Sequence, residues 1–187
     1  MLENIFPIIF SYLIGSIPFS FIIAKIRGVD LRERVKNGQI GAAAVKRSCG
    51  LFPAILVGTG DFSKGALAVF IARKLTRQDW IIILSGLAAI IGHNWSVYLK
   101  FWGGKGALVS FGSLFYLLTT PFLFSIPLII PFLLITRKEI FGMRKASFFT
   151  GLGYISLSIF SSILKYSIPL SLSSIFFSLP MMLKKNY

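Results

Sequence analysis

The sequence predicts an all-α membrane protein with about seven transmembrane helices and glycine-rich loops on one side. Hydrophobic residues make up 55% of its 187 residues, and the mean hydropathy is +0.79. The apolar runs reach the length of about 20 residues that crosses a bilayer as a helix. Basic residues fall in the short segments between these runs, as they do in proteins whose Lys and Arg residues set membrane orientation.

The apolar runs define the expected spans in order. They cover residues 5–26, 51–72, 80–99, 107–119, 121–136, 148–164 and 167–183. The first run contains Pro7, Gly15 and Pro18, and we expect it to be a retained helix because no cleavage site follows it. The stretch Thr119-Thr120-Pro121 fits either a kink or a hairpin. Without repeats or linkers, residues 1–187 are expected to form a single polytopic domain.

Lys and Arg are unequally distributed between the two sides that seven spans would create. The richer side holds the basic residues of segments 27–50, 100–105, 137–145 and 184–185, and the other holds only Arg73, Lys74, Arg77 and Lys165. The richer side should be cytoplasmic. This places the amino terminus outside, the carboxyl terminus inside and both glycine-bearing loops at the cytoplasmic face.

The charge and the cysteine content exclude several classes of function. A formal net charge of +14 would suggest nucleic acid for a soluble protein, but here it is explained by membrane orientation and by attraction to anionic lipids. The same field favours an anionic substrate. Cys49 is the single cysteine, and the six acidic residues form no ligand cluster by spacing, so neither a metal nor a cofactor is indicated.

The first glycine-bearing loop has the features of an anion site. Gly38 and Gly41 bracket Gln39 and precede an alanine-rich stretch that should be helical. The N–H groups at a helix amino terminus lack partners within the helix and attract anions. Arg47, further along that helix, offers a fork of donors to a phosphate. The alternative is a basic amphipathic segment that lies on the lipid surface.

The second loop, Gly103-Gly104-Lys105-Gly106, is the stronger candidate for a phosphate site. Glycines allow backbone N–H groups to converge on an anion, and the lysine adds a full positive charge. The spacing is not that of a Walker loop. The alternative is a flexible hairpin whose lysine only sets the topology.

Asp61, Lys64 and His93 are ionisable residues within apolar spans and are candidates for functional roles. Asp61 and Lys64 are three residues apart and therefore share one helix face. Because charges in hydrocarbon are costly, the pair should face the bundle interior and neutralise itself, or contact a ligand. His93, the single histidine, is a candidate general base or phosphate contact. The alternative for His93 is a helix-end residue satisfied by the backbone or a loop.

The sequence lacks the constellations on which most acyl-transfer enzymes depend. It has no Ser-His-Asp arrangement, no His-x-x-x-x-Asp dyad and no paired carboxylates near the loops. A catalysed reaction would therefore need a substrate that is itself reactive. An acyl phosphate meets this need, because phosphate is a good leaving group and the protein has only to align a hydroxyl and stabilise negative charge.

Four segments resemble one known family. They are Tyr12–Phe19, Gly28–Arg32, the Asp-x-x-Lys-Gly stretch Asp61–Gly65, and Gly92–Gly106 with its glycine-lysine loop. Together they resemble the acyl-phosphate-dependent glycerol-3-phosphate acyltransferases of bacterial membranes, the PlsY family. The resemblance covers roughly residues 10 to 112.

The resemblance implies a seven-helix bundle in the bacterial inner membrane with a cytoplasmic active site. It implies transfer of an acyl group from acyl phosphate to the 1-hydroxyl of glycerol 3-phosphate, which gives lysophosphatidic acid and phosphate among membrane lipids. By position, Arg47, Lys105 and Asn37 are the implied catalytic residues. The implied phosphate-binding residues are Gly38, Gly41, Gly103, Gly104, Lys105 and Gly106, and the candidates for supporting roles are Gln39, Asp61, Lys64, His93 and Ser110.

The first family motif, Gly-Ser-Gly-Asn-Ile-Gly-Ala-Thr-Asn-Val-x-Arg, is altered in this chain. Asn37 stands at the serine, Gln39 at the first asparagine, and Ala43-Ala44 at the Thr-Asn pair. These changes remove several hydrogen-bonding groups from the expected pocket. They favour an alternative function, that of a non-catalytic relative that binds a phosphorylated metabolite or a lipid.

Two further departures concern the rest of the family pattern. Val109 stands at the threonine of the second motif, although Ser110 follows it. The family also has a motif with His and Glu-Asn after the last helix, whereas this sequence reads Leu183-Lys184-Lys185-Asn186-Tyr187 there. A third hypothesis for the function is an anion transporter. It would require helix breaks at equivalent positions in two halves of the sequence, and the sequence has no such symmetry.

Overall fold

The computed structural model describes residues 2–34 and 40–124, together with 155, 159, 161–164, 172–173 and 175–178. The elements are α1 (Leu2–Ser16), α2 (Phe19–Ile26), α3 (Leu31–Arg34), α4 (Ala42–Cys49), α5 (Leu51–Leu75), α6 (Asp79–Asn94), the 3₁₀ helix η1 (Val97–Leu99) and α7 (Ala107–Leu117). In this part of the chain the β-type pairing is one isolated bridge between Ser96 and Trp102. The predicted all-α fold is confirmed. Most of the last three expected spans lies outside the described residues, so the count of seven stays a prediction.

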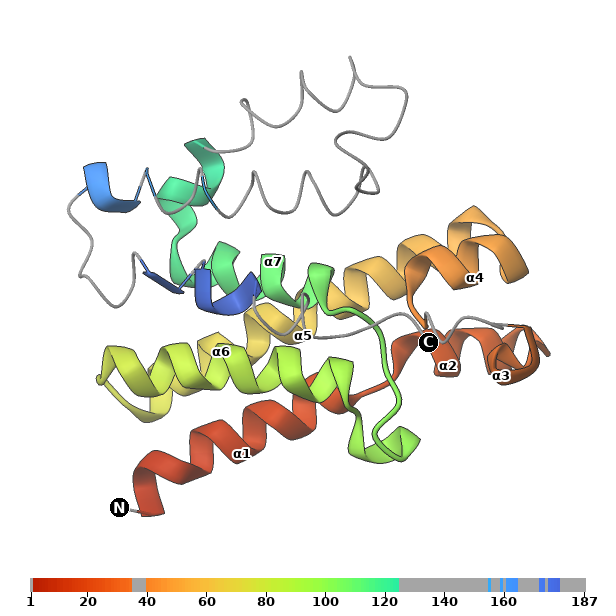
Figure 1. The fold of residues 1–187 in the computed structure, drawn as a ribbon, viewed down its shortest axis with the longest axis horizontal. Coiled ribbons are helices and arrows are strands. Elements are labelled where there is room, and N and C mark those ends of the chain that lie inside the picture. The colour runs from red at the N-terminus through yellow and green to blue at the C-terminus, as the bar shows by residue number, and fades with distance from the viewer. Residues whose placement is uncertain are drawn as a thin grey trace.

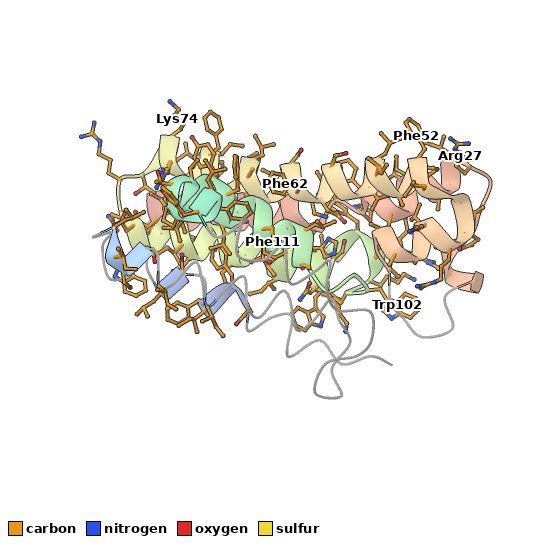
Figure 2. All side chains as sticks on the ribbon, turned by 90° about the horizontal axis from the view of Figure 1, so that it is seen from above. Arg27, Phe52, Phe62, Lys74, Trp102 and Phe111 are labelled. Atoms are coloured by element: carbon orange, nitrogen blue, oxygen red, sulfur yellow. The ribbon has the colours of Figure 1, made fainter. Side chains whose placement is uncertain are left out.

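Four helices form the body of the described part, and three shorter ones gather at one end (Figure 1). α1, α5, α6 and α7 run along the long axis, whereas α2, α3 and α4 lie together beyond the end of α1. α1 packs mainly on α6, and α5 packs on both α7 and α4. Figure 2 shows Lys74 at the opposite end of the molecule from Arg27 and Phe52. The two ends are therefore built differently, and only one carries the glycine-bearing loops.

The first expected span is two helices, not one. α1 ends at Ser16 and α2 begins at Phe19. Pro18 lies at the break because its ring lacks the N–H that a continuous helix would need. The carbonyl of Ile17 accepts a hydrogen bond of 2.9 Å from the Nζ of Lys64, so α5 satisfies a backbone group at the break.

The next boundaries also differ from those expected. α5 continues to Leu75, and α6 ends at Asn94, so residues 95–99 leave the expected third span and form part of the following loop. The stretch at Thr119 is a kink: α7 ends at Leu117, and helical backbone resumes at residue 119. Hydrogen bonds from Leu118 to Leu114 and from Phe122 to Leu118 bridge the kink.

The distribution of side chains is that of a protein in lipid. Two segments, Asn4–Ile26 and Leu51–Leu75, are long and apolar enough to cross a membrane, and α6 and α7 are shorter apolar helices. Large apolar side chains point outward, among them Phe6 and Ile9, which are 58% and 55% exposed. Polar side chains such as Ser11 and Ser85 are buried instead. Because lipid solvates the apolar exterior, small and polar residues can mediate helix contacts inside.

Glycines allow the helices to approach closely. A Cβ on Gly15 would lie 2.0 Å from the carbonyl oxygen of Ala89, and one on Gly112 would lie 1.9 Å from that of Phe62. Both neighbours are backbone atoms and cannot move aside. These contacts fix the distances between α1 and α6 and between α5 and α7, and through them the position of the loops.

Candidate functional site

A cavity of about 380 Å³ lies where the two glycine-bearing segments meet. Its lining residues are Ile40, Gly41, Ala42, Ala43, Ala44, Arg47, Asp61, His93, Lys105, Gly106, Ala107 and Leu108. They come from α4, α5, α6, α7 and the loop residues directly before α4 and α7. Five predicted site residues besides Gly41 are therefore found around one space. Asp61 lies ten residues after the start of α5, which corresponds to about 15 Å along the helix axis. The cavity therefore extends along α5 from its amino-terminal end toward the middle of the helix.

Two helix amino termini open into this cavity. Gly41 and Ala42 mark the start of α4, and Gly106 and Ala107 mark the start of α7. Gly106 has a φ of 77°, in the left-handed region that favours glycine. The first N–H groups of each helix point away from its own hydrogen-bond ladder. Together the two termini give the cavity a positive potential that suits an anion.

Two basic side chains add full charges to this potential. Arg47 projects from α4 and is exposed, whereas Lys105 lies in the second loop and is half-buried. A guanidinium offers paired donors to a phosphate, and an ammonium acts as a compact charge. The cavity therefore combines backbone donors with two cations, which is the chemistry of a phosphate site.

Asp61, Lys64 and His93 form a cluster at the inner wall of the cavity, which Asp61 and His93 line. The Nζ of Lys64 lies 2.8 Å from Oδ1 of Asp61 and 2.9 Å from Nδ1 of His93. Nδ1 of His93 is 3.5 Å from the same Asp61 oxygen. Both Asp61 and Lys64 are only 3% exposed. The expected pairing of Asp61 with Lys64 inside the bundle is present, and Nδ1 of the His93 ring contacts this pair.

The second loop is packed directly on His93. The N–H of Gly104 donates to the carbonyl of His93 at 3.2 Å. A Cβ on Gly104 would lie 2.3 Å from Nε2 of His93 and 2.5 Å from the carbonyl oxygen of Ile40. A Cβ on Gly103 would lie 2.0 Å from the His93 carbonyl oxygen. Glycine is needed at both positions for the loop to pack directly against His93.

The same loop is tied to α1 at its other end. The hydroxyl of Tyr12 donates to the carbonyl of Trp95 at 2.9 Å, and the hydroxyl of Ser96 donates to the carbonyl of Ser16 at 2.6 Å. Sequence reasoning did not identify these anchors. Their side chains are ordinary serine and tyrosine in an apolar context, and only the packing of α1 against α6 gives them partners.

The remaining predicted residues are placed differently. Ser110 is buried in α7, its hydroxyl donates to the carbonyl of Ala107 at 2.9 Å, and it is not part of the cavity wall. Asn37, Gly38 and Gln39 lie outside the described residues. Ala43 and Ala44 do line the cavity, so the altered part of the first motif contributes methyl groups there.

Two other features of the described residues lie apart from this chemistry. No group of three or more His, Cys, Asp or Glu residues that could hold a metal ion is found there. An open hollow of about 490 Å³ between α2 and α3 includes Lys25 and Arg32 but none of the predicted site residues. The site chemistry is therefore concentrated in the smaller cavity.

The geometry agrees with comparisons to known proteins. A family model described as glycerol-3-phosphate acyltransferase matches residues 5–185. The chain belongs to this family. A glycerol-3-phosphate acyltransferase of Thermus thermophilus is 40% identical over 137 residues, which cover 73% of this chain and 68% of the relative. Glycerol-3-phosphate acyltransferase 1 of Deinococcus radiodurans is 47% identical over 111 residues, 59% of this chain and 56% of the relative.

Solved structures of the family have the same fold. The glycerol 3-phosphate form of PlsY, an integral membrane glycerol 3-phosphate acyltransferase, superposes with a TM-score of 0.82 at 32% identity. The lysophosphatidic acid form of that protein gives 0.79 at 31% identity. Each comparison covers 97% of this chain and 87% of the other. The predicted family is confirmed, and the chain is a member of an integral membrane acyltransferase family.

Proposed function

We propose that this chain transfers an acyl group from acyl phosphate to the 1-hydroxyl of glycerol 3-phosphate and forms lysophosphatidic acid for phospholipid synthesis. The observation that carries the proposal is the cavity of about 380 Å³, where Arg47, Lys105 and two helix amino termini converge. A phosphorylated substrate with a small polar body suits this site. The family relationship supplies the reaction class.

The proposed chemistry needs no protein nucleophile. The oxygen at carbon 1 of glycerol 3-phosphate attacks the carbonyl carbon of the acyl phosphate, and the bond from that carbon to the phosphate oxygen breaks. The hydroxyl proton ends on the departing phosphate. Arg47, Lys105 and the backbone N–H groups hold the phosphate charge and stabilise the negative charge that develops at the carbonyl oxygen. No cofactor takes part in these steps.

The implied site residues keep their roles in this proposal. Arg47, Lys105 and Asn37 act on the substrates, and Gly38, Gly41, Gly103, Gly104 and Gly106 supply close backbone approach. Gln39, Asp61, Lys64 and Ser110 are assigned supporting roles. Residues 1–187 form one polytopic domain in this account.

A second function is favoured by one observation. Ala43 and Ala44 present methyl groups to the cavity where the family motif has Thr and Asn. A site that keeps its cations but loses these polar groups would suit a protein that binds a phosphorylated metabolite or lipid without turnover. In the same assay the first function predicts lysophosphatidic acid, and the second predicts binding without any product.

The test is an assay of the purified chain with acyl phosphate and glycerol 3-phosphate, in which lysophosphatidic acid is measured by mass spectrometry. Turnover above the rate without protein, with release of one phosphate per product, is the expected result. Acyl-coenzyme A in place of acyl phosphate should give no product. Absence of product, in a preparation that binds glycerol 3-phosphate by calorimetry, would leave the binding function as the correct one.

Replacement of either cation should weaken phosphate binding. Arg47→Ala or Lys105→Ala is expected to reduce the free energy of glycerol 3-phosphate binding by about 1.5–3 kcal/mol, the range for hydrogen bonds to charged groups. Calorimetry in detergent measures this loss. Lys46→Ala is the matched control, since Lys46 is the exposed neighbour of Arg47 on α4 and does not line the cavity. Equal losses in all three variants would indicate diffuse surface attraction and contradict a defined pocket.

We propose the bacterial inner membrane as the location, with the cavity at the cytoplasmic face. Gln78 lies between α5 and α6, and Lys46 lies on α4 near the opposite end of α5. In a Cys49→Ala background, a membrane-impermeant maleimide added to spheroplasts should label Gln78→Cys but not Lys46→Cys. Both should be labelled after permeabilisation. Labelling of Lys46→Cys alone in intact spheroplasts would reverse the orientation.

A further inference from the structure

The ammonium of Lys64 lies within 3 Å of three electronegative atoms, one in an ion pair and two in hydrogen bonds. Its Nζ lies 2.8 Å from Oδ1 of Asp61, 2.9 Å from the carbonyl oxygen of Ile17 and 2.9 Å from Nδ1 of His93. An ammonium carries three N–H donors and has no lone pair. A neutral amine in this place would leave the Asp61 carboxylate without the counter-charge that lies 2.8 Å away, which is costly in the interior. Lys64 therefore makes an ion pair with Asp61 and hydrogen bonds with the Ile17 carbonyl and with Nδ1 of His93.

This arrangement fixes the tautomer of His93. A donor cannot face another donor at 2.9 Å, so Nδ1 must accept the bond from Lys64 and carries no proton. The Asp61 oxygen is 3.5 Å from Nδ1, longer than the 2.8 Å and 2.9 Å contacts that Lys64 makes to these two atoms. Asp61 and His93 therefore share Lys64 as donor. The proton of the neutral ring lies on Nε2.

The Nε2 edge of His93 faces the glycine loop. It lies against the backbone of Gly104, since a Cβ there would be 2.3 Å from Nε2. His93 also lines the cavity that holds Arg47 and Lys105. A donor on this edge suits an anionic oxygen, and a nitrogen that already carries a proton cannot accept one from a substrate hydroxyl.

We propose that His93 is a neutral hydrogen-bond donor to the substrate phosphate, held in its Nε2–H form by Lys64, and is not a general base. Lys64 is then a positioning residue that acts through His93. The ligand is a phosphate oxyanion, whether of glycerol 3-phosphate or of acyl phosphate. The phosphate contact rests on the proposed function, which requires a phosphorylated substrate in this cavity. The tautomer of the His93 ring does not depend on turnover and can be measured without it.

The single histidine of the sequence allows a direct measurement. Protein with ¹⁵N-labelled histidine, prepared without a histidine tag, gives ring signals from His93 alone in an NMR spectrum. Nε2 couples to both ring C–H protons, and this pattern identifies it. One protonated Nε2 and one unprotonated Nδ1 are expected at neutral pH. A protonated Nδ1, in either a neutral ring or an imidazolium, would overturn the proposal.

Ligand titrations test the phosphate contact and its source. Glycerol 3-phosphate and inorganic phosphate should both shift the Nε2 signal, while glycerol at the same concentration should not. A non-hydrolysable acyl phosphonate should shift it before glycerol 3-phosphate is added if the acyl phosphate is the partner. An unchanged Nε2 signal with each phosphorylated probe, when calorimetry shows binding, would overturn the contact. No binding of any phosphorylated probe would overturn the proposed function instead, with the tautomer measured separately.

Variants separate a donor from a structural residue. His93→Gln keeps an N–H donor on a side chain of similar reach, whereas His93→Leu removes it. The Kd for glycerol 3-phosphate should rise roughly tenfold or more in His93→Leu and be largely restored in His93→Gln. Equal losses of affinity in the two folded variants, His93→Gln and His93→Leu, would assign His93 a packing role only.

A double variant tests the role of Lys64. In Asp61→Leu with Lys64→Met, the neutral His93 ring should no longer be confined to the Nε2–H form. An unchanged tautomer in this variant would contradict the role of Lys64.

Discussion

Replacing Asp61 by Asn is expected to lower the free energy of unfolding by about 3–5 kcal/mol, the usual cost of breaking a buried ion pair by removing one partner. The change keeps the shape of the side chain but leaves the ammonium of Lys64 without its counter-charge 2.8 Å away. Both residues are only 3% exposed, so water cannot replace the lost partner. Thermal unfolding of the purified protein in detergent, followed by circular dichroism, measures the loss.

Removal of both charges provides the comparison. The double variant Asp61→Leu with Lys64→Met contains no unpaired charge, and we expect it to be more stable than Asp61→Leu alone. If Asp61→Asn were as stable as the native protein, the Asp61–Lys64 pair would not be buried away from water, in contradiction to the structure. The same conclusion would follow if the double variant were no more stable than Asp61→Leu.

Substitution of Gly104 by Ala should reduce glycerol-3-phosphate acylation by at least about 10²-fold, because displacement of a positioned group by about 1 Å can cost this much. The new Cβ would overlap Nε2 of His93 and the carbonyl oxygen of Ile40, at 2.3 Å and 2.5 Å. The loop must therefore move away from His93 and Ile40, and the neighbouring Lys105 is displaced with it. The kcat and KM of purified protein give the effect.

Gly58→Ala is the matched control for the added methyl group. A Cβ on Gly58 would meet only Cδ1 of Leu108, at 3.4 Å, and this atom is the end of a flexible side chain. We expect near-native turnover and stability for this variant. A folded Gly104→Ala variant with native kinetics would show that the loop does not need its close approach to His93.

Much of the architecture and of the site was predictable because it depends on local signals. Long apolar runs predict helices in lipid, and glycines beside Lys105 and before the alanines of α4 predict anion sites. The spacing of Asp61 and Lys64 predicts that they share a face, and the cost of charge in hydrocarbon predicts that this face is interior. Each inference needed only residues close in the sequence.

The features that were not predicted depend on contacts between distant segments. Lys64 reaches the carbonyl of Ile17 and the ring of His93, which are 47 and 29 residues away. No local pattern predicts that the break at Pro18 would lie beside this lysine. The start of the fourth span at residue 107 was predicted correctly, but the contribution of the α7 amino terminus to the anion site was not, although Gly106 directly before an apolar helix was a usable signal. The contact of the His93 ring with Lys64 of α5 was also not predicted, because the notion of a helix-end histidine satisfied by the backbone or a loop involves no distant side chain.

The central claim is that Arg47 and Lys105, which lie 58 residues apart in the sequence, bind one phosphate in a single pocket. A double-mutant cycle on glycerol 3-phosphate binding tests it most directly, with Arg47→Ala, Lys105→Ala and the combination measured by calorimetry. We predict a coupling energy between about 0.5 and 3 kcal/mol, as for residues that share one partner. Losses that simply add would place the two cations at independent sites and contradict the account.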